Sequence, residues 1–226
     1  MNGNRGLWRI AGWLAVVHVV LMLGSFALQR VSPLGAGTAT VVKDHVTWSM
    51  TKGFMGGYLT GVSFLVFLLL ASLLGRLLRG GTEISGWLSS TIVASGSLYV
   101  AVTLAGVLPA LGAALYDGHH GAPLSTVTAF DHMHWFAVFT ATLVLGVFIL
   151  TVSVAVWMTG VLSRWVSYSG FVAGVACLVA VPGARAGLVD DATLVWVVWF
   201  LGFAVAALRG PRPVPRQATS RPAAAS

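Results

Sequence analysis

Histidine and aspartate are the side chains of this sequence that could do chemistry, and most of them fall in two short regions. One region is residues 44–45 and the other is residues 117–134, which together hold Asp44, His45, Asp117, His119, His120, Asp131, His132 and His134. Side chains of these types bind divalent metals or transfer protons. On a helix, Asp131 and His134 share one face because they are three residues apart, whereas His132 and His134 point in nearly opposite directions.

The Asp131 and His134 pair predicts one specific site. With His119 or His120 from the preceding loop as a third ligand, the pair would form an open divalent-metal site of a catalytic or transport type. The alternative is that these residues are only solvated, because polar residues collect in exposed loops and no C-x-x-C or H-E-x-x-H spacing is present. The single cysteine, Cys177, excludes a thiolate metal site and a disulfide framework, so no other cofactor is indicated.

His18 differs from the other histidines because it lies near the middle of the first apolar stretch. An ionisable group at that depth is costly and normally faces protein or water. Two interpretations stay open: a neutral imidazole bonded by a serine or a carbonyl of a neighbouring helix, or a role in a proton relay, a cavity or ligand binding. His18, Asp131 and His134 are therefore the candidate catalytic residues. A haem shared by His18 and His134 is not favoured, because their predicted depths differ.

Long apolar stretches must position these side chains. The composition, 57% hydrophobic and 8% charged over 226 residues, predicts an all-α, polytopic transmembrane bundle, with the lipid bilayer as its surroundings. We expect six spans, at about residues 7–28, 54–75, 87–112, 133–158, 165–183 and 192–208. Residues 1–208 would then form one transmembrane domain. Residues 209–226, rich in Pro, Arg and Ala, would form a disordered tail.

The cationic residues indicate the orientation of this bundle. Counting through six spans, one side receives Arg5, Arg9, Arg76, Arg79, Arg164, Arg209, Arg212, Arg216 and Arg221, and the other receives Arg30, Lys43, Lys52 and Arg185. The positive-inside rule then places both termini in the cytoplasm, in a cell (plasma) membrane. The net charge of +7 is thus a topology signal and not a sign of nucleic-acid binding. Cleavage of the first stretch as a signal peptide is the less favoured alternative, because that stretch is too long.

Small residues predict how the spans pack. Gly53, Gly57 and Gly61 recur every four residues, as do Gly170 and Gly174, and such faces let helices approach closely within the bundle or against another membrane protein. The serines at 89, 90, 95 and 97 indicate either tight packing, which we favour, or a polar cavity wall. Pro109 predicts a kink. In the long loop 30–52, the spacing of Val42, Val46 and Met50 predicts a short helix, either resting on lipid, as we favour, or forming a lid.

Two sequence runs carry a resemblance to other proteins. Residues 5–13, RGLWRIAGW, and residues 165–175, WVSYSGFVAGV, resemble the corresponding stretches of a broad group of uncharacterised bacterial membrane proteins with six to seven spans. The resemblance implies this fold, and it transfers no activity and no functional residue. The excess of Arg over Lys also suggests a bacterial source.

Three classes of function fit this sequence. We favour a non-enzymatic accessory, binding or permeation component, which needs only the packing described above. The alternatives are a membrane-embedded enzyme that acts on a lipid or isoprenoid-like substrate through the Asp/His cluster, and an outward-facing metal or proton sensor. The spans carry no central carboxylate, Lys or Arg, which argues against an ion-coupled transporter, and the P-loop and G-x-S-x-G signatures are absent.

Overall fold

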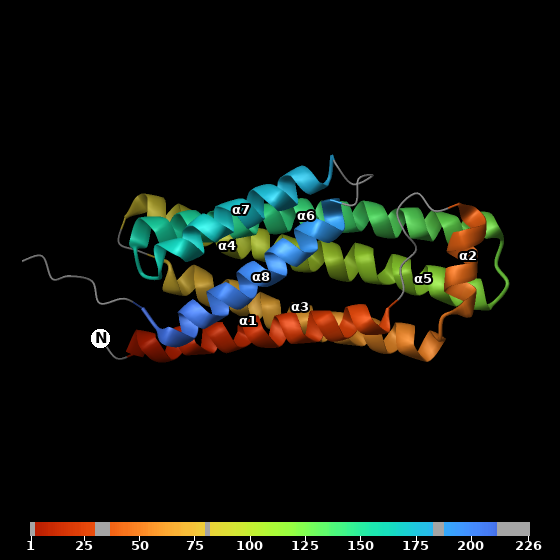
Figure 1. Ribbon diagram of the computed structural model, residues 1–226, viewed down its shortest axis with the longest axis horizontal. Helices are drawn as coiled ribbons and strands as arrows, with labels where there is room; N and C mark the ends of the chain where they lie inside the picture. The colour runs from red at the N-terminus through yellow and green to blue at the C-terminus, as the bar shows by residue number, and fades with distance from the viewer. Residues whose placement is uncertain (1–2, 30–36, 80–81, 183–187, 212–226) are drawn as a thin grey trace, which may run out of the picture.

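The computed structural model describes residues 3–29, 37–79, 82–182 and 188–211, and this part of the chain is helical, without strands (Figure 1). The all-α prediction is therefore confirmed. The elements are α1 (Gly3–Leu28), α2 (Thr38–Thr47), α3 (Met50–Leu77), α4 (Glu83–Val102), the π-helical turn η1 (Thr103–Val107), α5 (Leu108–His119), α6 (Leu124–Thr159), α7 (Arg164–Ala180) and α8 (Leu188–Arg209).

The long helices form a closed ring. Going around it, α1 packs on α3, α3 on α4, α4 on α6, α6 on α7, α7 on α8, and α8 returns to α1. The interior is aromatic, because Phe64, Phe67, Phe148, Phe200 and Phe203 are all fully buried there. Rings from different helices meet edge to face, as in the contact of Phe67 with Tyr99 at 5.1 Å. This aromatic core fills the ring at its centre.

The outer surface of the ring is apolar. Large exposed side chains cover it, among them Val20, Leu65, Leu69, Leu98, Val172, Val179 and Val198. Five segments are long and apolar enough to cross a membrane: α1, α3, the continuous helix from α4 to α5, α6 and α8. Helix α7 is also apolar but has only 17 residues. An apolar exterior on helices of this length indicates a multi-pass, membrane-embedded protein.

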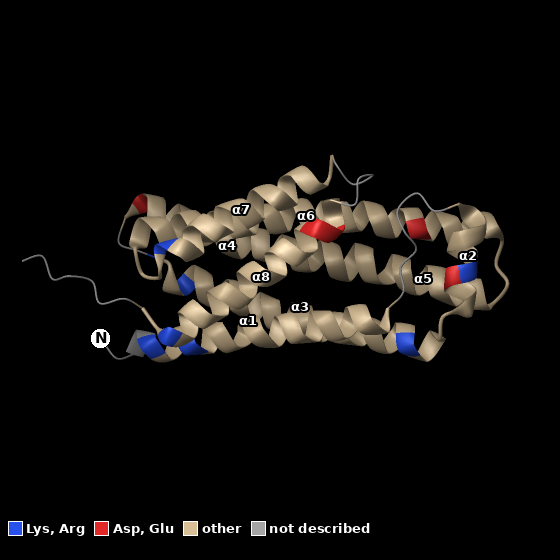
Figure 2. Ribbon diagram, viewed as in Figure 1, with Lys and Arg blue, Asp and Glu red and all other residues tan. Residues whose placement is uncertain are grey.

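Charged residues divide between the two ends of the ring (Figure 2). The arginines of the described residues gather at the end that holds the start of α1 and the end of α8, whereas the opposite end carries Asp44, Asp117 and Asp131 together with both lysines, Lys43 and Lys52. We call that opposite end, where α2 and α5 lie, the acidic end. Helices α5 and α6 reach furthest in that direction, since α6 has 36 residues and the span expected there had only 26.

The structure accommodates Pro109 with a change of helix type. Residues Thr103–Val107 form a π-helical turn immediately before the proline, and Pro109 then occupies the first turn of α5. The proline has no N–H to donate to the helical ladder, and the wider turn before it gives its ring room. The irregularity predicted from the proline is therefore present, as a π-turn within one continuous helical segment.

Small residues make the closest helix contacts. A methyl group at Gly174 would lie 3.1 Å from the Gly146 carbonyl oxygen, and Gly170 packs on Ser153 and Trp199, so this face is occupied by α6 and α8 of the same chain. The other predicted face, that of Gly53, Gly57 and Gly61, is in contact at one end only. Gly53 meets Leu115 of α5, but nothing lies within 4 Å of a methyl group at Gly61. In α4, Ser89 donates to the Gly75 carbonyl of α3, whereas Ser90 and Ser95 donate to carbonyls of their own helix, Gly86 and Thr91. The preferred packing interpretation is confirmed for the buried Ser89 and Ser95, whereas Ser90 is exposed.

Helix α2 covers the acidic end of the bundle. A short helix in this loop was predicted correctly, but its buried face was not. Val41 and His45 are buried, whereas Val46, which the spacing had placed on the apolar face, is exposed. The helix packs on α5 and α6, with Val41 against Ala114 and Val127, so it caps these helices by direct contact.

Candidate functional site

A central cavity of about 370 Å³ lies inside the ring, in the half toward the acidic end. Every helix of the ring except α7 contributes to its walls. Apolar residues such as Met22, Val138 and Leu145 line most of it, and seven other side chains add polar groups: Gln29, Thr60, Thr103, His134, Thr142, Asp190 and Thr193. From Leu145 to His134 the wall rises along α6 by about 16 Å. The volume of this cavity and the composition of its walls are typical of a small-molecule binding site.

Aromatic side chains close the deep end of the central cavity. Phe64, Tyr99 and Trp196 line it, and the imidazole of His18 lies behind them, with ring centroids 5.8 Å from Phe64 and 6.3 Å from Trp196. His18 is itself fully buried, between α3 and α8. It therefore supports the floor of the cavity without lining it.

His18 forms a closed set of hydrogen bonds with Ser63 of α3. Its Nδ1 lies 3.1 Å from the Ser63 carbonyl oxygen and 2.7 Å from Ser63 Oγ, while that hydroxyl donates to the His18 carbonyl at 3.0 Å. A carbonyl only accepts, so Nδ1 carries the hydrogen and Nε2 keeps a lone pair. Nε2 is buried and has no partner among the described residues. The predicted partners of His18, a serine and a carbonyl of a neighbouring helix, are confirmed.

Asp131 and His134 lie on one helix face, as predicted, but each bonds to a different partner. Asp131 Oδ1 lies 3.3 Å from His45 Nε2, and both side chains are buried at the base of α2. His134 Nδ1 donates to the carbonyl oxygen of Val107, at the end of η1, across 3.1 Å. His134 lines the central cavity, whereas Asp131 does not line it. The buried Asp131–His45 pair joins α2 to α6.

His119 and His120 do not join this group. Each donates from Nδ1 to a carbonyl of its own helix turn, at 2.9 Å and 2.8 Å, and His120 stacks on Tyr116. His132 lies on a separate surface hollow between α5 and α6. Within residues 3–29, 37–79, 82–182 and 188–211, no three His, Cys, Asp or Glu side chains come together as metal ligands would.

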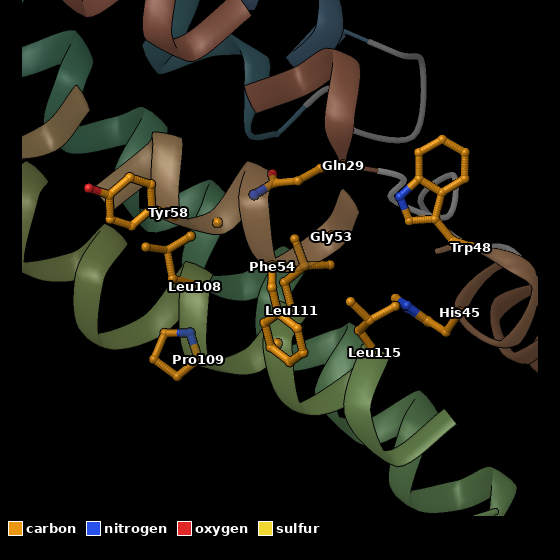
Figure 3. Close-up of a pocket in the computed structure, with 12 residues that line it drawn as sticks. Gln29, His45, Trp48, Gly53, Phe54, Tyr58, Leu108, Pro109, Leu111 and Leu115 are labelled. Carbon is orange, nitrogen blue, oxygen red and sulfur yellow. The ribbon is translucent and has the colours of Figure 1, made fainter. Parts of the chain in front are cut away.

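A second cavity, of about 360 Å³, lies beside the central one, between α3 and α5 (Figure 3). Figure 3 shows His45 and Trp48 at one end of it, and Tyr58 and Pro109 at the other. Its walls are almost entirely apolar, and we call it the side cavity. Gln29 and Leu108 line both cavities, so these two side chains stand between them.

Several residues of the central cavity were missed in the sequence. Thr60, Thr103, Asp190 and Thr193 come from three separate segments, α3, η1 and α8, and no spacing links these segments. A signal was nevertheless present in the first stretch, because His18, Ser25 and Gln29 are 7 and 4 residues apart and share one helix face. In the structure Ser25 and Gln29 both bond to Thr60 Oγ1, at 2.5 Å and 3.4 Å.

Comparison of the chain with known protein families, with characterised proteins and with solved structures finds no match. The geometry of the cavities therefore carries the functional argument.

Proposed function

We propose that this chain is a non-enzymatic, small-molecule-binding protein of the plasma membrane, with six spans and both termini in the cytoplasm. Its ligand is an amphiphile, with a chain that occupies the deep part of the central cavity and a polar head near His134 and Asp190. The observation that carries this proposal is the cavity itself, which has apolar walls, polar groups from several helices and an aromatic floor.

The topology rests on charge and length together. Arg5, Arg9, Arg76, Arg79, Arg164 and Arg209 lie at the starts and ends of helices on one side of the ring, as the positive-inside rule requires of a cytoplasmic face. Helix α7, which is fifth in chain order, adds one span to the five longer segments and makes six, because its 17 apolar residues reach the lower limit of length for crossing a membrane. The central cavity then lies in the outer half of the membrane.

Binding is favoured over catalysis by the way the acidic and basic groups are used. The enzyme alternative needs Asp131 and His134 to act together on a substrate, yet Asp131 is engaged with His45 and does not line the central cavity. His134 presents one nitrogen to the cavity and has the other committed to a carbonyl. Such an arrangement can hold a head group, and it does not form an acid and base pair at one reacting atom.

The experiment that tests this proposal is equilibrium binding of tritiated single-chain amphiphiles to the full-length protein in lipid nanodiscs. We expect saturable binding with one molecule per chain, above that of empty nanodiscs. Ala141→Phe should abolish it, because Ala141 lines the central cavity and the new ring would fill it. Ala94→Phe is the matched control, since Ala94 is exposed on the outside of α4. Absence of saturable binding, or equal binding by the two variants, would contradict the proposal.

A further inference from the structure

The hydroxyl groups of the central cavity have already used their hydrogens. Thr103 donates to the Tyr99 carbonyl at 3.0 Å, Thr142 to Val138 at 2.8 Å and Thr193 to Val189 at 2.9 Å. Thr60 donates to the Gly56 carbonyl at 3.1 Å and also bonds to Ser25 and Gln29, so it adds no free acceptor. The hydroxyls of Thr103, Thr142 and Thr193 therefore present only lone pairs to the cavity, and each can only accept a further hydrogen bond.

The other polar groups of the wall add to this excess of acceptors. His134 gives its Nδ1 hydrogen to the Val107 carbonyl, which leaves Nε2 as an acceptor. Three lining side chains keep a hydrogen to donate, and they are Gln29, Tyr99 and Trp196. The indole nitrogen of Trp135, a fourth lining residue, is buried, has no partner among the described residues and so does not face the open space. Acceptors thus outnumber donors on the cavity surface.

The charge of the wall points the same way. Among the described residues that line the central cavity, Asp190 is the one carboxylate, and none is Lys or Arg. Asp190 and Asp191 lie in the first turn of α8, so the helix N-terminus already has its anionic complement. A phosphate or carboxylate head would face acceptors and a like charge, whereas an ammonium head would meet Asp190, threonine oxygens and aromatic faces.

We infer that the ligand of the central cavity is a cationic amphiphile, an alkyl or isoprenyl chain that ends in a protonated amine. This inference rests on the proposed function and narrows its ligand. The ammonium donates to Asp190, which is exposed at the cavity wall, and to the threonine oxygens, while the chain runs toward Phe64 and Leu145. A neutral alcohol offers one donor and binds more weakly, and an anionic head is disfavoured.

The test compares three tritiated probes with the same chain, dodecylamine, dodecanol and dodecyl phosphate, on the full-length protein in phosphatidylcholine nanodiscs, with empty nanodiscs subtracted. Dodecylamine should bind about tenfold more tightly than dodecyl phosphate, because hydrogen bonds to a charged donor are the strong ones. Asp190→Asn should weaken dodecylamine binding by about fivefold and leave dodecanol unchanged. Asp191→Asn is the matched control, because Asp191 is exposed, as Asp190 is, but does not line the cavity.

A second variant pair tests the acceptors without changing charge. Thr103→Val replaces a lining hydroxyl acceptor with a methyl group in a side chain of similar shape, and it should weaken the binding of both dodecylamine and dodecanol. Thr151→Val removes an equivalent hydroxyl, bonded to the Val147 carbonyl on the exposed side of α6, and should change neither. If none of the three probes binds, the proposed function itself fails. If they bind but dodecyl phosphate equals dodecylamine, or the two Asp variants behave alike, the cationic ligand is refuted while the cavity remains a binding site.

Discussion

The buried hydrogen bonds between His18 and Ser63 allow a prediction, because substitution of the Ser63 hydroxyl and of the His18 imidazole should lower the unfolding free energy by different amounts. Ser63→Ala deletes the hydroxyl that lies 2.7 Å from His18 Nδ1, but the Ser63 carbonyl at 3.1 Å still accepts from that nitrogen. No hydrogen is left unbonded, so the loss should resemble that of one interhelical bond in a membrane protein, about 0.6 to 1.7 kcal/mol of unfolding free energy.

His18→Phe should cost little. The ring sits among Phe64, Phe67, Trp196 and Phe200, which already form an aromatic enclosure, and the substitution removes the unpartnered Nε2. Replacing a partly satisfied polar group with an apolar one of similar shape is nearly neutral, so we expect a change within about 1 kcal/mol. The Ser63 hydroxyl keeps its acceptor, because it donates to the backbone carbonyl of residue 18.

Unfolding in mixed micelles of mild detergent and sodium dodecyl sulfate, followed by circular dichroism, measures both variants and the double variant in one thermodynamic cycle. The coupling energy should be about 0.6 kcal/mol and should not exceed about 1.7 kcal/mol. A loss of about 3 kcal/mol or more in Ser63→Ala would show that the carbonyl does not serve as the second partner. An equally large loss in His18→Phe would refute a mainly structural role for the imidazole.

Two further substitutions test the packing and the cap. Gly174→Ala should lower the unfolding free energy by about 1 to 2 kcal/mol, because its methyl group meets Leu150 and the Gly146 carbonyl. Gly61→Ala, with nothing within 4 Å, should be neutral or stabilising in the same micelle titration. Equal effects would show that α6 and α7 are not in close contact. His45→Ala should leave the buried Asp131 carboxylate without its histidine partner and release α2, which would appear as faster amide hydrogen exchange over residues 41–47. His120→Ala, at an exposed histidine, should leave this exchange unchanged. Unchanged protection in His45→Ala would mean that Val41 alone holds the helix.

The helices were predictable because apolar length and small-residue spacing are local signals. The long stretches became helices near the expected positions, and Gly170 and Gly174 packed within the bundle as their spacing indicated. The extent of α6 was underestimated, because residues 124–132 are polar enough to look like a loop, although they form a helix beyond the apolar stretch. The apolar part of a helix is thus easier to predict than the residue at which its polar extension ends.

The site was harder to predict because its contacts are not local. The contact of His45 with Asp131 was not predicted, because the two residues are 86 positions apart, and the face of α2 expected from Val42, Val46 and Met50 was wrong. His119 and His120 donate hydrogen bonds to carbonyls of their own helix turn, and residue spacing alone does not distinguish this arrangement from metal binding. The cavity depends on where α8 passes α1 and α6, and no motif of the sequence encodes that position.

The measurement that tests the central claim most directly is photo-crosslinking with a dodecylamine that carries a diazirine near the end of its chain. The full-length protein in nanodiscs would be labelled at saturation, digested and mapped by mass spectrometry. The account predicts adducts on residues of the deep cavity wall, chiefly Met22, Ala141 and Leu145, and their loss in Ala141→Phe. Adducts confined to lipid-facing residues such as Leu65 and Val172 would contradict it and would leave the cavity without a ligand.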